Sequence, residues 1–270
     1  MRPFLLFPAA LLLACAPISS AQTLIFPAGS VELAEVTIVG TDVQRKTGGP
    51  KIPVSSIVRV EFPKPEELAA ADDLLLKAKY EEAYAKAKIT QDFHRPWKDK
   101  PGSWYAPASL LVAESLLRQN KYDDSARLMS ELRNMTLPGQ LQMRVTLLDA
   151  REQFQKGINQ PALTKVNSLL KSVKDSDTAA RLYLLLGDIQ FKRESFEEAL
   201  DAYLHVPVFY GAEAAFLPAA DLGAARSLSR LGRFKDAIDS FARISERYLG
   251  TPEADAAQKE KADLSKLQGQ

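Results

Sequence analysis

Two stretches of the chain share one pattern and decide the fold. They are Arg193-Glu194-Ser195-Phe196-Glu197-Glu198-Ala199-Leu200 and Gly232-Arg233-Phe234-Lys235-Asp236-Ala237-Ile238. In both, an aromatic residue is followed by one or two acidic residues and then by an alanine, three positions after the aromatic ring. Acidic side chains favour the first turn of a helix because of the helix dipole, and a small residue lets two helices approach closely. The pattern predicts a turn between two closely packed helices.

The same pattern recurs three more times toward the N-terminus. These copies are Ala78-Lys79-Tyr80-Glu81-Glu82-Ala83-Tyr84, Asn120-Lys121-Tyr122-Asp123-Asp124-Ser125-Ala126 and the degenerate Lys156-Gly157-Ile158-Asn159-Gln160-Pro161-Ala162-Leu163. The small residue of the five copies falls at Ala83, Ser125, Ala162, Ala199 and Ala237, at spacings of 42, 37, 37 and 38 residues. Such a period is typical of helical repeats, in which each repeat buries the apolar face of its neighbour. We therefore expect helical repeats over residues 64–264 and a polar tail over residues 265–270.

The two most regular copies resemble the tetratricopeptide repeat family. The residues that carry the resemblance are Tyr183, Leu186, Gly187, Phe196, Ala199 and Tyr203 in one copy, and Ala225, Gly232, Phe234, Ala237 and Phe241 in the next. The middle copy departs from the family pattern, because Pro161 replaces an acidic residue. The spacings also exceed the usual 34 residues. The resemblance implies a right-handed α-solenoid of about five helix pairs. It also implies a non-enzymatic scaffold of the bacterial envelope, similar to outer-membrane assembly and Tol-Pal-associated types.

The first twenty-one residues have the features of a secretory signal peptide. Arg2 provides a positive charge, Phe4 to Cys15 is almost wholly apolar, and Ser19-Ser20-Ala21 offers small residues for cleavage. Leu12-Leu13-Ala14-Cys15 also resembles a bacterial lipoprotein box, which would anchor the mature protein to a membrane through a lipid on Cys15. Both alternatives predict export, to the periplasm or the periplasmic face of the outer membrane, with secretion as the second choice.

Residues 22–63 differ from the rest of the chain and predict a small β-rich module. Glu35 to Val39 alternates polar and apolar residues, Lys46 to Pro50 has the composition of a turn, and Ile52 to Phe62 is again strand-like. The segment resembles small β-modules of exported bacterial proteins that end in an I-x-x-V-x-F strand. Pro63 and Pro65 mark its boundary.

Charge and motifs restrict the classes of function. Without its signal peptide the chain has 34 basic and 34 acidic residues, and this balance argues against nucleic acid as a partner. Cys15 is the only cysteine and His94 and His205 are the only histidines, so the sequence predicts neither a disulfide nor a metal site. It has no phosphate-binding loop, zinc-protease motif or nucleophile elbow. We expect no catalytic residues, no cofactor and no enzymatic activity.

The first helices of the repeats supply the candidate binding site. In the family register they line a concave groove, which would make it basic and suited to a protein or peptide partner. Its predicted partner-binding residues are Arg144, Arg151, Lys156, Arg181, Lys192, Arg226 and Arg230. Arginine suits the bidentate capture of carboxylates, so the ligand would be an acidic segment or a C-terminal carboxylate. The alternative is a solvated face whose cations pair with local acids.

An insertion between the first two copies is the alternative interface. Residues 94–105 hold both tryptophans of the chain, and Trp97, Trp104 and Tyr105 are aromatic anchors of the kind enriched at interfaces. They would either close the seam between the β-module and the repeats or bind a cell-wall polymer or an enzyme for which the chain is an accessory subunit. A third hypothesis is a self-associating structural protein with Leu249 and Leu264 exposed. The oligomeric state is left open by the sequence.

Overall fold

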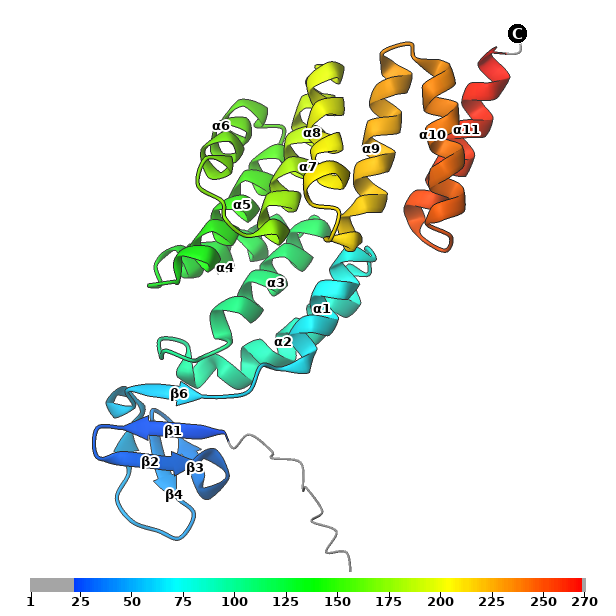
Figure 1. Cartoon of the computed structure of the whole chain (residues 1–270). Helices are drawn as coiled ribbons and strands as arrows, with labels where there is room; N and C mark the ends of the chain where they lie inside the picture. Colours follow the sequence, from blue (N-terminus) through cyan, green and yellow to red (C-terminus); the bar gives the residue numbers. More distant parts are fainter. Residues whose placement is uncertain (1–21, 269–270) are drawn as a thin grey trace, which may run out of the picture. The chain divides into compact units, whose positions relative to one another are not determined.

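The computed structural model describes residues 22–268, so the expected signal peptide and Cys15 lie outside the described residues. The chain divides into two compact units, one of Met1–Lys64 with Lys100–Ser103 and one of Pro65–Asp99 with Trp104–Gln270. The protein is mainly helical with a small N-terminal β-rich region (Figure 1), as the sequence predicts. Within the described ranges, none of the helices has the length and apolar character that a membrane span requires.

The described part of the first unit holds six short strands in two antiparallel sheets. The strands are β1 (Thr23–Phe26), β2 (Gly29–Glu32), β3 (Val36–Val39), β4 (Asp42–Arg45), β5 (Ile52–Pro53) and β6 (Arg59–Glu61). One sheet has the order β2-β1-β6 and the other β3-β4-β5. Leu24 of β1 pairs with Val60 of β6, and both are buried with Val43 and Ile57. This apolar set forms the small core of the unit.

The β-rich unit also includes four residues from the aromatic insertion. The Val60 backbone N–H donates to the Pro101 carbonyl oxygen at 2.9 Å, and Lys100 Nζ donates to the Ser55 carbonyl oxygen at 2.9 Å. Gly102 has a φ of +86°, and a Cβ atom there would lie 1.8 Å from the Val60 carbonyl oxygen. Only glycine therefore fits at this close approach of two backbones.

The described part of the second unit consists of eleven α-helices, joined by turns and short 3₁₀ segments. They are α1 (Glu66–Leu76), α2 (Tyr80–His94), α3 (Tyr105–Arg118), α4 (Tyr122–Arg133), α5 (Gly139–Gln155), α6 (Asn159–Leu170), α7 (Ser176–Lys192), α8 (Phe196–Phe209), α9 (Leu217–Arg230), α10 (Phe234–Arg247) and α11 (Pro252–Gln268). Each predicted turn joins the first and second helix of a pair, from α1–α2 to α9–α10, and α11 follows the last pair. The expected polar tail begins inside α11, and Leu264 is buried against α9 and α10.

The five predicted turns share one backbone geometry. Each has a single residue with φ between 57° and 79°, namely Ala78, Asn120, Gly157, Glu194 or Gly232. In every turn the N–H of this residue bonds to the carbonyl three residues earlier, and the next N–H bonds to the carbonyl five residues earlier. This pairing satisfies the last carbonyls of the first helix and reverses the chain within a few residues.

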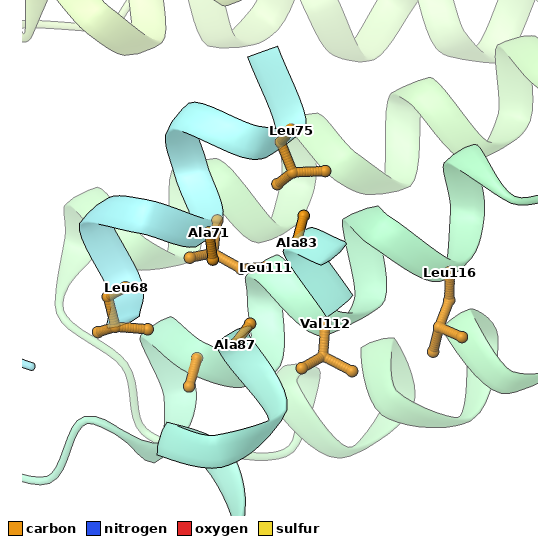
Figure 2. Packing of buried hydrophobic residues seen from close by; sticks show 9 residues of the cluster. Leu68, Ala71, Leu75, Ala83, Ala87, Leu111, Val112 and Leu116 are labelled. Atoms are coloured by element: carbon orange, nitrogen blue, oxygen red, sulfur yellow. The ribbon is translucent and has the colours of Figure 1, made fainter. Parts of the chain in front are cut away.

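The small residue of each copy lies where the two helices of a pair touch. Ala83, Ser125, Ala162, Ala199 and Ala237 are all almost fully buried. In the first pair, Ala83 and Ala87 of α2 pack with Leu68, Ala71 and Leu75 of α1 and with Leu111, Val112 and Leu116 of α3 (Figure 2). A larger side chain at the small position would push the helices of its pair apart.

Tyr203 joins three helices in the most regular copy. A Cβ atom at Gly187 of α7, or at Gly223 of α9, would lie 2.5 Å from its ring. The ring of this α8 residue thus occupies the space that two missing side chains leave. Its hydroxyl donates to Asp188 Oδ1 at 2.8 Å, which ties the apolar contact to a polar residue of α7.

The repeated turn predicts opposite effects of two substitutions. Glu194→Gly relieves a side chain from the left-handed region and should raise the free energy of unfolding by about 1 kcal/mol. Gly232→Ala places a side chain in that region with nothing within 4 Å, so it should lower the free energy by about 1 kcal/mol through backbone strain alone. Urea unfolding checks both values. Changes of equal sign would contradict the shared geometry.

Candidate functional site

One charged residue occupies the same position in every first helix. Counting back eleven residues from each small residue gives Asp72, Glu114, Arg151, Asp188 and Arg226, on α1, α3, α5, α7 and α9 respectively. We call this set the charge ladder. Each of these helices packs against the first helix of the next pair. The charge ladder therefore runs across neighbouring first helices. It contains both acidic and basic residues, whereas the sequence predicted a uniformly basic groove.

Arg181 forms the best-connected ion pair of this face. Its Nη2 atom lies 3.1 Å from both carboxylate oxygens of Asp72, and its Nε atom lies 3.0 Å from Asp177 Oδ2. The guanidinium also lies over the Phe216 ring, 4.9 Å from its centre. Burial by itself lowers the pKa of Arg181, but the attraction of Glu114, Asp72 and Asp177 raises it above the ordinary value. Arg181 is a satisfied structural cation.

Glu114 faces the largest number of arginines. Burial raises the pKa of its carboxyl group, yet Arg181, Arg118, Arg151 and Arg144 together hold that pKa below the ordinary value. The closest measured contact is 3.9 Å, from Arg118 Nη2 to Glu114 Oε1. The carboxylate of Glu114 is the anionic centre around which these cations gather.

Arg151 differs from Arg144, Arg181 and Arg226, each of which forms an ion pair. It is partly buried, and among residues 22–268 it has no side-chain hydrogen bond and no carboxylate oxygen within 4.0 Å. Burial, reinforced by the nearby charges of Arg118 and Arg181, lowers its pKa to about 10, although Glu114 and Asp188 oppose the shift. Its guanidinium nitrogens therefore make no hydrogen bond to the described residues, and none of them is fully shielded from solvent.

A small cavity adjoins this guanidinium. Its volume is about 20 Å³, and it is lined by Leu110, Glu114, Arg144, Leu147, Leu148, Arg151 and Arg181. That volume accommodates one oxygen atom, either of a water molecule or of a carboxylate. Burial raises the pKa of Asp188 on the next rung, against the opposing effects of Arg151 and of the Tyr203 hydroxyl. The centre of the face thus combines an unpaired cation with room for an acceptor.

The structure brings together only some of the predicted partner-binding residues. Arg144, Arg151 and Arg181 line one cavity, whereas Lys156, Lys192, Arg226 and Arg230 do not. Their contacts differ. Lys156 Nζ lies 2.6 Å from Glu152 Oε1, and Arg226 donates to both carboxylate oxygens of Glu260 on α11. Arg230 stacks on the Phe196 ring. Lys192 is exposed and has no ion pair in the described chain. Most of the predicted partner-binding residues are therefore paired with local acids.

Three residues of this face were missed by the sequence argument. Asp72, Glu114 and Arg118 belong to the first two pairs, to which the family register was not extended. The signal is nevertheless in the sequence, because Asp72 and Glu114 precede Ala83 and Ser125 by the same eleven residues that separate Arg151 from Ala162. Including them changes the expected basic groove into a face of mixed charge.

The aromatic residues of the insertion lie inside the helical unit. Trp97 and Tyr105 are 1% and 0% exposed, and Trp104 packs against the α1–α3 cluster shown in Figure 2. The Tyr105 hydroxyl donates to Glu131 Oε2 of α4 at 3.0 Å. Burial leaves Trp97 and Tyr105 no free surface with which to hold a polymer, whereas Trp104 is half-buried.

Both histidines have structural surroundings. His94 is 1% exposed, and its Nδ1 atom accepts from the Trp104 backbone N–H at 3.4 Å. Burial lowers the pKa of His94 to about 4. His205 stacks on Tyr183, with 4.5 Å between ring centres. Among residues 22–268, no group of three or more His, Cys, Asp or Glu side chains is placed to hold a metal ion.

Comparisons of the sequence with protein-family models and with curated proteins found no match.

His94 predicts a pH-dependent stability. The pKa of the folded state lies below the value of about 6.5 for an unfolded histidine, so the unfolded chain takes up a proton first as the pH falls. The contribution of neutral His94 to the free energy of unfolding is fully present above pH 6.5. It should decrease by about 3 kcal/mol as the pH falls to 4, and then level off.

Urea unfolding of the wild type and of His94→Asn between pH 4 and 7.5 measures this contribution, because asparagine retains an acceptor near the Nδ1 position. The difference in free energy of unfolding between the two proteins should shrink as the pH falls. His205→Gln is the matched control and should follow the wild type. A difference that stays constant with pH would contradict the assignment.

Proposed function

We propose that this chain is an exported, non-enzymatic scaffold of tetratricopeptide type, and that it binds a carboxylate of a protein or peptide partner at Arg151. Five helix pairs with one turn geometry and one register support the repeat assignment. On this proposal the pairs form a right-handed α-solenoid whose first helices face the ligand. The apolar N-terminal segment supports export to the periplasm.

The observation that carries the proposal is the unpaired state of Arg151. A partly buried cation without a partner is costly, and proteins keep such groups where a ligand completes them. Arg118 and Arg144 add positive charge close by, through their shared interaction with Glu114. A carboxylate oxygen that enters the cavity and accepts a hydrogen bond from Arg151 adds a negative charge and reduces the repulsion among these arginines.

The paired arginines limit what the ligand is. Arg181 and Arg226 are engaged by Asp72, Asp177 and Glu260, so a long acidic segment would have to displace these contacts. A single carboxylate needs only Arg151. We therefore favour a chain terminus, or one acidic side chain of the partner, over a polyacidic stretch.

Two other functions receive less support. The polymer-binding hypothesis requires exposed aromatic rings, and Trp97 and Tyr105 are buried. The self-association hypothesis rests on Leu249 and Leu264 being exposed together. Leu249 is 81% exposed, but Leu264 packs with α9 and α10.

Arg151→Met tests the proposal without the ambiguity of an unfolded variant. Removing an unpaired charge from a partly buried position should raise the free energy of unfolding by about 1–2 kcal/mol. A random peptide pool with free C-terminal carboxylates is then selected on immobilised protein, beside the same pool amidated at the C-terminus. The wild type should enrich peptides from the free pool, and Arg151→Met should not.

Arg127→Met is the matched control, because Arg127 is an exposed cation of α4 that pairs with Asp124. It should enrich the same peptides as the wild type. Equal enrichment by the wild type and by Arg151→Met would refute a carboxylate site at Arg151.

A further inference from the structure

A second hollow lies on another side of the helical unit. Its volume is about 800 Å³, and its lining residues come from α8, α9 and α10 and from Arg233 and Tyr248, which flank α10. Leu200 and Leu204 of α8 line one wall, and Ala224 and Leu228 of α9 line the floor. Ile244 of α10 and Tyr248, which follows α10, line the other wall. An adjoining hollow of about 410 Å³ shares Leu200, Leu204 and Arg233 and extends toward the N-terminal end of α8. We call the two together the α8–α10 groove.

The groove is distinct from the charge ladder. Arg226 stands two residues from both Ala224 and Leu228 on α9. Two residues correspond to about 200° around a helix, which places Arg226 on the opposite side from the groove floor. A ligand in the α8–α10 groove would therefore leave the surroundings of Arg151 free.

An apolar row on α8 remains exposed beside this groove. Leu200, Leu204 and Val208 follow one another at intervals of four residues, so they lie along one line of the helix. Leu204 is 42% exposed, Val208 67% and the adjacent Phe209 68%. Large apolar side chains that continue a hollow in this way mark a surface for another macromolecule.

The two walls bear charges of opposite sign. On α10, Arg243 Nη2 donates to Ser240 Oγ, Arg247 stacks on the Tyr248 ring, and neither forms an ion pair within the described residues. On α8, Glu197 and Asp201 line the end of the groove, one turn apart, and neither pairs with Lys or Arg within the described residues, although Asp201 Oδ2 lies 3.7 Å from His205 Nδ1. Glu246 also lines the α10 side, one residue before Arg247.

We propose that the α8–α10 groove binds an amphipathic helix of a partner protein. The apolar face of that helix would cover Leu200, Leu204 and Val208, in the way that helices fill grooves between helices. Acidic residues on one flank would meet Arg243 and Arg247, and basic residues on the other flank would meet Glu197 and Asp201. Because reversal of the helix would exchange its two flanks, a helix with one acidic and one basic flank complements both walls in one direction only.

Three synthetic helical peptides with one leucine face test this pairing. The first has one flank of Glu and one of Lys, the second has Lys on both flanks, and the third has Glu on both. Fluorescence anisotropy should show the mixed peptide binding about tenfold more tightly than either of the others. The double variant Arg243→Glu, Arg247→Glu should reverse the preference in favour of the peptide with Lys on both flanks.

Val208→Ser removes an exposed apolar contact and should weaken the binding of the mixed peptide about fivefold or more. Leu249→Ser, at a residue that is 81% exposed and does not line the groove, should leave it unchanged. Arg151→Met should also leave it unchanged, so this proposal and the carboxylate site fail or succeed separately. Peptide binding that is indifferent to Val208→Ser and to the charge reversal overturns the proposal. Self-association in sedimentation experiments that Val208→Ser abolishes also overturns it, since a second copy would then be the occupant.

Discussion

The left-handed residue in each of the five turns is the constraint on which the helical unit depends. It ends the first helix with its carbonyls satisfied, and the second helix begins two residues later. The small residue that follows then lies directly against the first helix. Because the turn fixes this offset, a residue at a given distance before the small residue points to the same face in every pair. The turn thereby determines which side chains share the charge ladder.

Electrostatic compensation across the ladder explains why a face with many arginines is stable. Glu114 and Asp72 each interact with more than one cation, and Arg181 is held by two aspartates and an aromatic ring. Buried or half-buried charges remain favourable only when each finds a partner. Arg151 departs from this rule while lying between two acidic rungs. On the proposed function, a carboxylate of the partner supplies the missing negative charge at this position.

The helix pairs, the turns and the β-rich segment could be predicted because their signals are local: aromatic, acidic and small residues at fixed spacing, or alternating apolar residues. The ionic partners of Arg181 could not, because Asp72 is 109 residues distant and is brought close only by the packing of α1 near α7. The sequence also could not predict that Lys100–Ser103 belong to the β-rich unit, because this depends on a backbone hydrogen bond between Val60 and Pro101. The α8–α10 groove left no motif, because it results from what α8 and α10 leave uncovered.

On the proposed function, Arg151 binds a ligand carboxylate, whereas Arg144, Arg181 and Arg226 stay in their ion pairs. The most direct test records the side-chain ¹⁵Nε NMR signals of the arginines during titration with an acetylated peptide that ends in a free carboxylate, with its amidated form as the reference. The account predicts that the Arg151 signal shifts with the free peptide only, while the signals of Arg181 and Arg226 stay in place. Equal shifts with both peptides, or shifts confined to exposed residues such as Arg127, would contradict it.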